Sequence, residues 1–111
     1  MDDDSDIQSL ISESENSEEV QDIMVEFIEP RRCNGTLRFE DDEIIIKYND
    51  SYPLRVSYFK IINWRSSKLI WGIDYKDSNK VMNRIMVKYK DPAELNKMIR
   101  EKVNYFVNNV L

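Results

Sequence analysis

The sequence has 111 residues, of which 21 are acidic and 16 are basic, so its formal net charge is −5. This length is enough for one domain and too short for two. The chain contains no histidine, which removes the commonest general base and metal ligand and excludes Ser-His and Cys-His catalytic pairs.

The first 22 residues differ in charge from the rest of the chain. They hold nine of the acids and no Lys or Arg, which leaves twelve acids and all 16 basic residues in the remainder. Their apolar side chains are too few to offset the entropy cost of ordering a chain. We therefore predict a disordered acidic segment over residues 1–22 and one folded domain over residues 23–111. Within the segment, Ser12 stands three positions before Glu15, a spacing that suits phosphorylation by an acid-directed kinase.

Short strands separated by turn residues follow this segment. Apolar residues alternate with their neighbours at every second position, which is typical of strands. In the first half of the domain, strands are expected over residues 23–28, 36–39, 44–48 and 54–58. The residues between them favour turns, with Pro30 ending the first strand and Asn34-Gly35 marking the next turn.

The alternation is broken in the middle of the chain. The apolar phase slips near Phe59 and the apolar run continues to Trp64, which indicates a bulge or bend between two strands. Residues 65–68 then favour a turn. Two further alternating strands are expected over residues 69–75 and 83–89, joined by a polar loop at residues 76–80.

A helix is expected after the last strand. Asp91 is a good N-cap, Pro92 fits the first helical position, and Glu94 stands where a capping box requires an acid. The apolar residues that follow recur at helical spacing and form one wide face: Leu95, Met98, Ile99, Val103, Phe106, Val107 and Val110. About seven strands and one terminal helix predict an α+β fold, mainly β, in which a curled antiparallel barrel is capped by the helix.

This order of elements resembles the pleckstrin-homology-like (PH-like) superfold, and within it the phosphotyrosine-binding (PTB) domains and the third lobe of FERM domains. The most specific stretch, residues 53–75, reads PLRVSYFKIINWRSSKLIWGIDY. FERM third lobes carry an apolar strand, an Ile-x-x-Trp-like strand, a Ser/Lys turn and an alternating strand in this order. Residues 53–75 resemble that order. The first two strands are shorter than is usual in these families. The resemblance implies a domain that binds other proteins.

Catalytic and metal-binding motifs are missing from the sequence. With only Gly35 and Gly72, no glycine-rich phosphate loop can form. The acids at residues 41–43 lack calcium-loop spacing and are interpreted as a solvated turn. The single cysteine, Cys33, has no partner for a metal site or an internal disulfide and indicates a reducing compartment. We therefore predict no cofactor, no metal and no enzymatic activity.

Targeting signals are also missing. No apolar run approaches the ~20 residues that span a bilayer, and the acidic N-terminus is unlike a secretory or mitochondrial presequence. The prediction is a cytoplasmic or nuclear protein.

Trp64 is the aromatic residue that stands out, because it ends the non-alternating run and precedes a polar turn. In the PTB and FERM domains that the sequence resembles, this strand is a sheet edge beside the C-terminal helix, and peptides add to it as an extra strand. The resemblance implies a peptide-binding site formed by Ile62, Asn63, Trp64, Arg65, Ser66, Ser67 and Phe106. A barrel-core position for Trp64 is the alternative.

Basic residues suggest a second kind of site. Arg31, Arg32 and Arg38 surround the first turn, where PH domains that bind phosphoinositides carry basic residues, although the usual motif is poorly matched. The acidic N-terminal segment would compete for such a surface, which argues against nucleic acid as a ligand.

The sequence therefore leaves three hypotheses open. The first is an adaptor or scaffold that binds a peptide or a partner subunit. The second is a membrane-targeting module that binds anionic lipid, and the third is a structural subunit of a larger assembly.

Overall fold

The structure is a computed structural model that describes residues 20–49 and 51–109. Its elements are β1 (Ile23–Glu29), β2 (Cys33–Phe39), β3 (Glu43–Tyr48), β4 (Leu54–Ser57), the 3-10 helix η2 (Tyr58–Lys60), β5 (Ile61–Ser67), β6 (Ile70–Lys76), β7 (Met82–Lys88) and α1 (Pro92–Asn109). Most of the predicted disordered segment, residues 1–19, lies outside the described residues, as does Val110 of the predicted helix face.

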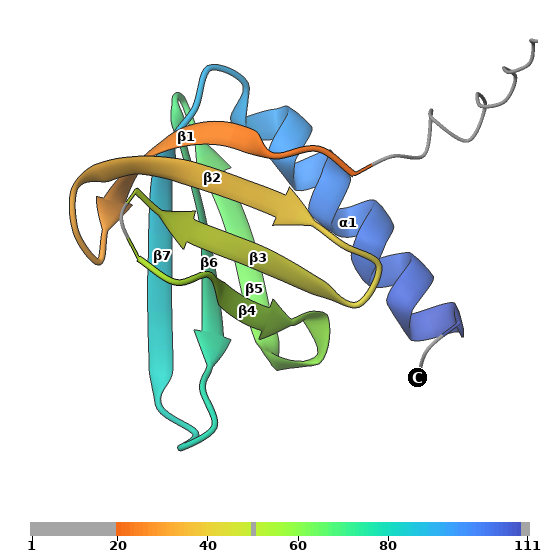
Figure 1. Cartoon of the computed structure of the whole chain (residues 1–111). Helices are drawn as coiled ribbons and strands as arrows, with labels where there is room; N and C mark the ends of the chain where they lie inside the picture. Colours follow the sequence, from red (N-terminus) through yellow and green to blue (C-terminus); the bar gives the residue numbers. More distant parts are fainter. Residues whose placement is uncertain (1–19, 50, 110–111) are drawn as a thin grey trace, which may run out of the picture.

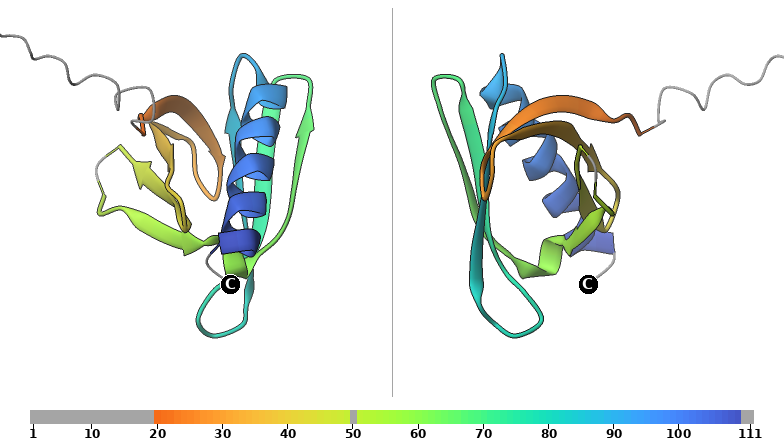
Figure 2. Two further views of the ribbon diagram at one scale, coloured as in Figure 1. Left: turned by 90° about the vertical axis from the view of Figure 1, so that its right-hand side faces the viewer. Right: turned by 60° about the vertical axis from the view of Figure 1, so that its left-hand side comes forward.

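The strands form one sheet in the order β4-β3-β2-β1-β7-β6-β5, and every pair of neighbours is antiparallel (Figure 1). The sheet bends so that β1–β4 and β5–β7 face each other, and α1 covers the side that is left open (Figure 2). This is the predicted α+β, mainly β fold, a curled antiparallel barrel capped by a C-terminal helix. The arrangement is compatible with a PH-like fold.

The core lies between the curled sheet and α1. Its fully or almost fully buried side chains come from alternate strand positions and from one helix face: Val25, Phe27, Leu37, Phe39, Ile44, Ile46, Val56, Tyr58, Trp71, Ile73, Tyr75, Ile85, Val87, Leu95, Ile99 and Phe106. Burying an apolar side chain of this size contributes ~1.5–3 kcal/mol. The alternating apolar residues of the strands and the helically spaced apolar residues of α1 therefore pack into one core.

The start of α1 agrees with the predicted cap. The side-chain Oδ1 of Asp91 accepts a hydrogen bond from the backbone N–H of Glu94 at 3.3 Å, and Pro92 is the first helical residue. The cap provides an acceptor for an N–H that has no partner within the helix.

The predicted turn at Asn34-Gly35 is wrong, because both residues lie inside β2. The chain turns earlier, between Glu29 and Cys33. Gly35 is needed for close packing, since a Cβ there would collide with the Lys47 carbonyl oxygen and the Phe27 ring. β1 and β2 are consequently seven residues long each, longer than the sequence predicted.

The predicted turn at residues 65–68 is also misplaced, whereas the break near Phe59 is confirmed. A 3-10 helix interrupts the chain at Tyr58–Lys60, and the register of β5 against β6 shifts between Ile61 and Asn63. β5 continues to Ser67, and the tight turn follows with Lys68 in the left-handed region at φ 52°.

Candidate functional site

β5 is an edge of the sheet. It pairs with β6 along residues 61–67, and no other strand of the described chain pairs with it. An edge strand leaves a row of backbone N–H and C=O groups without partners in the protein, and these groups can bind another strand. The opposite edge, β4, is only four residues long, so β5 offers the longer row.

Pairing with β6 fixes which way the β5 side chains point. Directly opposed residues in an antiparallel pair share a face of the sheet. Trp64 lies opposite Ile73, which is buried, so Trp64 faces the core and is partly buried against it. Arg65 lies opposite Gly72 on the outer face. Ile62 stands at the register shift and is half exposed.

α1 lies beside β5 and is joined to it by Asn96. The Nδ2 of Asn96 donates a hydrogen bond to Ser66 Oγ at 2.8 Å, and its Oδ1 accepts one from Trp71 Nε1 at 2.7 Å. One amide thus connects the helix, the edge strand and a core indole. Positions one, two and three turns further along the same helix stripe are Arg100, Val103 and Val107.

The helix runs antiparallel to β5, so its end lies beside the start of β5. The ring of Phe106 packs edge-on against Tyr58 in η2, with centroids 6.1 Å apart. Phe106 is only 6% exposed, so it supports the wall of the site from inside the core. The apolar side chains that are exposed at this end are Phe59, Ile62 and Val107.

On the outer face, two arginines hold one carboxylate. Asp74 Oδ2 is 2.5 Å from Arg65 Nη2, and Asp74 Oδ1 is 2.9 Å from Arg84 Nε. Asp74 is 6% exposed. Burial alone would raise the pKa of Asp74, but the hydrogen bonds from Arg84 and Arg65 outweigh it and hold the pKa below its usual range. This cluster connects β5, β6 and β7 in register.

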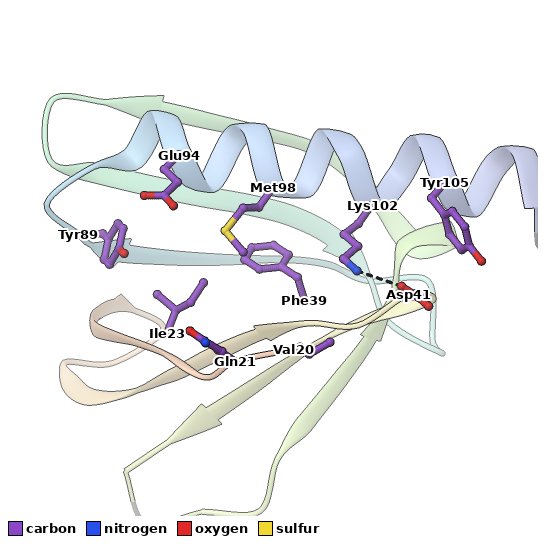
Figure 3. A pocket seen from close by; sticks show the side chains of 10 residues that line it. All are labelled: Val20, Gln21, Ile23, Phe39, Asp41, Tyr89, Glu94, Met98, Lys102 and Tyr105. Atoms are coloured by element: carbon purple, nitrogen blue, oxygen red, sulfur yellow. Dashed lines mark hydrogen bonds and ion pairs between the residues drawn. The ribbon is translucent and has the colours of Figure 1, made fainter. Parts of the chain in front are cut away.

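The other flank of α1 contains a groove of about 790 Å³. Ile23, Phe39 and Met98 line it, and an ion pair of 2.9 Å between Lys102 Nζ and Asp41 Oδ1 crosses one end (Figure 3). The strands on this side, β1 and β2, are already paired on both edges. The groove can therefore receive side chains but offers no free strand edge.

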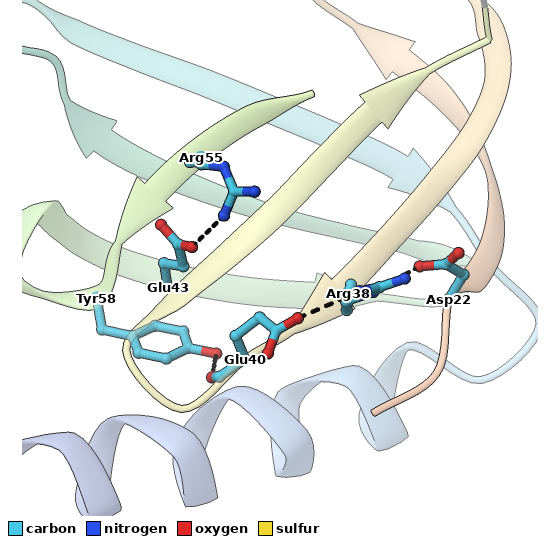
Figure 4. A network of polar contacts seen from close by, with 6 residues as sticks. All are labelled: Asp22, Arg38, Glu40, Glu43, Arg55 and Tyr58. Carbon is cyan, nitrogen blue, oxygen red and sulfur yellow. Dashed lines mark hydrogen bonds and ion pairs between the residues drawn. The ribbon is translucent and has the colours of Figure 1, made fainter. Parts of the chain in front are cut away.

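The three arginines of the predicted lipid site are not brought together. Arg31 and Arg32 lie in the β1–β2 turn, whereas Arg38 lies near the other end of β2. Arg38 is bound by Asp22 at 2.9 Å and Glu40 at 3.4 Å (Figure 4). These carboxylates raise the pKa of Arg38, first through the hydrogen bond that Arg38 donates to Asp22.

The arginines of the β1–β2 turn have partners as well. Arg31 lies 5.2 Å from the centroid of the Tyr48 ring, and Arg32 is 4.0 Å from Glu26. The geometry therefore offers no cluster of unpaired cations at this turn.

The acids of the β2–β3 turn surround a buried tyrosine. Tyr58 donates a hydrogen bond to the backbone oxygen of Glu40 at 2.6 Å (Figure 4). Burial and the nearby Asp41 and Asp42 raise the pKa of Tyr58. Tyr58 thus stays protonated and anchors the turn.

Among residues 20–49 and 51–109, no three His, Cys, Asp or Glu side chains form a group that could hold a metal ion. In the part of the chain that the structure describes, no helix combines the length and apolar character needed to cross a bilayer.

Sequence reasoning missed two residues of this region, Asp74 and Asn96. Asp74 stands at a polar position of an alternating strand, where the pattern does not distinguish it from a solvated residue. Asn96 stood between apolar helix positions without a distinguishing pattern. The signal for Asp74 was Arg84, ten positions away, since paired strands place such residues opposite each other.

No family model matches the chain, and a search of curated proteins returns no significant match.

Proposed function

We propose that this protein is a non-enzymatic adaptor that binds an extended segment of a partner protein at the β5 edge, beside α1. The observation that carries the proposal is the pairing of β5, which has β6 on one side and no described strand on the other. A partner strand added there would satisfy the free backbone groups of β5, which supplies affinity without a deep pocket.

Three further features support the proposal. Trp64 is partly buried beside the edge, and a large aromatic side chain in this position is a typical binding hot spot. In the PTB domains and FERM third lobes that the sequence resembles, peptides add to the corresponding strand. The lack of histidine in the sequence fits a binding role better than a catalytic one.

The test compares two folded variants of the full chain as baits. Trp64→Ala should weaken capture of a partner by ~2 kcal/mol, about thirtyfold. Tyr105→Ala, which removes an exposed aromatic from the other flank of α1, should leave capture unchanged. In the wild type, the bound partner should slow amide exchange over residues 61–67.

Equal capture by wild type and Trp64→Ala, without protection of β5, would refute the proposal. Chemical shifts confined to residues 31–38 would instead favour the lipid hypothesis.

A further inference from the structure

Basic residues outnumber acidic ones along β5 and the segment before it. From Ser51 to Ile73 the chain has no Asp or Glu, and it has four basic residues: Arg55, Lys60, Arg65 and Lys68. Arg55 is bound by Glu43. Asp74, the first acid after this stretch, is held by two arginines. Because Arg65 and Arg84 share the one carboxylate of Asp74, this group keeps a net positive charge beside the edge.

α1 adds to this charge. Arg100 lies one turn after Asn96 on the stripe that faces β5, and it is exposed. The acids of the same helix, Glu94 and Glu101, lie about 140–160° around the helix axis from Asn96, at 100° per residue. An approaching segment would therefore meet cations on both sides of the edge.

The two faces of β5 differ in chemistry. A strand that pairs with β5 directs alternate side chains to the α1 side and to the outer face. The α1 side offers the apolar surfaces of Trp64, Val103 and Val107, and the outer face offers Arg65. Each second residue of the ligand thus meets an apolar surface, and the residues between them meet a cation.

We infer that β5 selects an extended segment of a partner protein in which acidic residues alternate with bulky apolar ones. The acids lie on the outer face beside Arg65, and the apolar side chains pack between Trp64 and Val107. This inference rests on the proposed function and adds the chemistry of the partner. The acidic segment of the chain itself, residues 1–22, does not show this strict alternation.

The experiment titrates the labelled full chain with three synthetic peptides. The first reads Thr-Glu-Val-Glu-Phe-Glu-Thr. The second has the same composition with its acids grouped, Thr-Glu-Glu-Glu-Val-Phe-Thr, and the third replaces each Glu by Lys. The first should shift the amides of residues 61–67, and the other two should bind at least about tenfold more weakly. Raising the salt concentration should weaken binding of the first peptide.

Two charge reversals provide the matched variants. Arg100→Glu should weaken binding of the first peptide about three- to tenfold. Lys47→Glu changes the charge equally on the exposed surface of β3 and should have no effect. Both variants must show the wild-type melting transition.

Each remaining outcome decides against some part of the idea. If the grouped or the Lys peptide binds β5 as well as the first, the inference fails and the proposed function stands. If none of the peptides shifts β5, both fail. Shifts at Ile23, Phe39 and Met98 would place binding in the opposite groove and refute the inference. A β5 already protected in the free protein would show that residues 1–19 or a second copy occupies the edge, which also refutes it.

Discussion

The two flanks of α1 offer opposite kinds of surface. The flank toward β1 and β2 has a hollow of about 790 Å³, but its strands are paired on both sides and an ion pair crosses it. The flank toward β5 has seven residues of strand with a free edge. Because an extended ligand binds through unpaired backbone groups, the volume of a hollow alone is a poor guide to where such a ligand would bind.

The largest expected effect concerns the residue that supports α1 against the sheet. Phe106→Ala should lower the free energy of unfolding by ~3–5 kcal/mol, because it leaves a cavity beside Tyr58. Urea unfolding followed by circular dichroism measures the change. The neighbouring Val107→Ala removes an exposed side chain and should cost less than ~0.5 kcal/mol. A small change in the free energy of unfolding on Phe106→Ala would mean that Phe106 does not hold α1 against the sheet.

The second effect concerns the cluster that fixes β5 in register. Asp74→Asn should cost ~1.5–3 kcal/mol, because it replaces two charge-assisted hydrogen bonds from arginine. Glu101→Gln, which removes an exposed carboxylate from α1, should cost less than ~0.5 kcal/mol.

The same cluster predicts how stability depends on pH. The pKa of Asp74 is lowered in the folded state, so the stability it contributes is complete above its unfolded pKa, about 4, and is lost as pH falls through the folded value. The difference between wild type and Asp74→Asn should therefore shrink on acidification below about pH 4. A difference that stays constant down to pH 2 would show that ionised Asp74 contributes nothing.

A smaller effect is expected from the amide of Asn96, which joins α1 to β5 and to the Trp71 indole. Asn96→Ala removes the acceptor of the Trp71 indole N–H and the donor to Ser66, at a cost of about 1 kcal/mol. Hydrogen exchange should rise in β5 and stay unchanged in β2. Equal increases in both strands would indicate global destabilisation and no specific role at the edge.

The smallest effect tests the opposite flank. Lys102→Met removes the ion pair with Asp41 and should change stability by less than ~1 kcal/mol. Peptide binding at β5 should be unaffected. Weaker binding in this variant would contradict the separation of the two flanks.

Local patterns sufficed for the elements whose cause is local. The helix follows from the Asp91 cap and the apolar spacing after it, and the break at Phe59 follows from the slipped alternation. The free edge of β5 was implied only by resemblance, since strand order depends on pairings between residues far apart in the sequence.

The errors occurred where distant residues decide the local structure. Asn34-Gly35 looks like a turn, yet Gly35 is required by Lys47 and Phe27 from two other strands. Ser66 looks like a turn residue, yet β5 extends through it, with Asn96 bonded to its side chain 30 positions away. The ion pair of Arg38 with Asp22 likewise joins residues 16 positions apart, and no local pattern predicts it.

The two tryptophans occupy environments different enough to serve as separate optical reporters. Trp71 is fully buried and its indole N–H is bonded to Asn96, whereas Trp64 is only partly covered at the edge. A ligand that covers β5 should therefore shift the emission of Trp64 to the blue and leave that of Trp71 in place. Unfolding should move both to the red. Trp64→Phe and Trp71→Phe variants each retain one tryptophan. Their fluorescence would distinguish a ligand bound at the β5 edge from unfolding of the core.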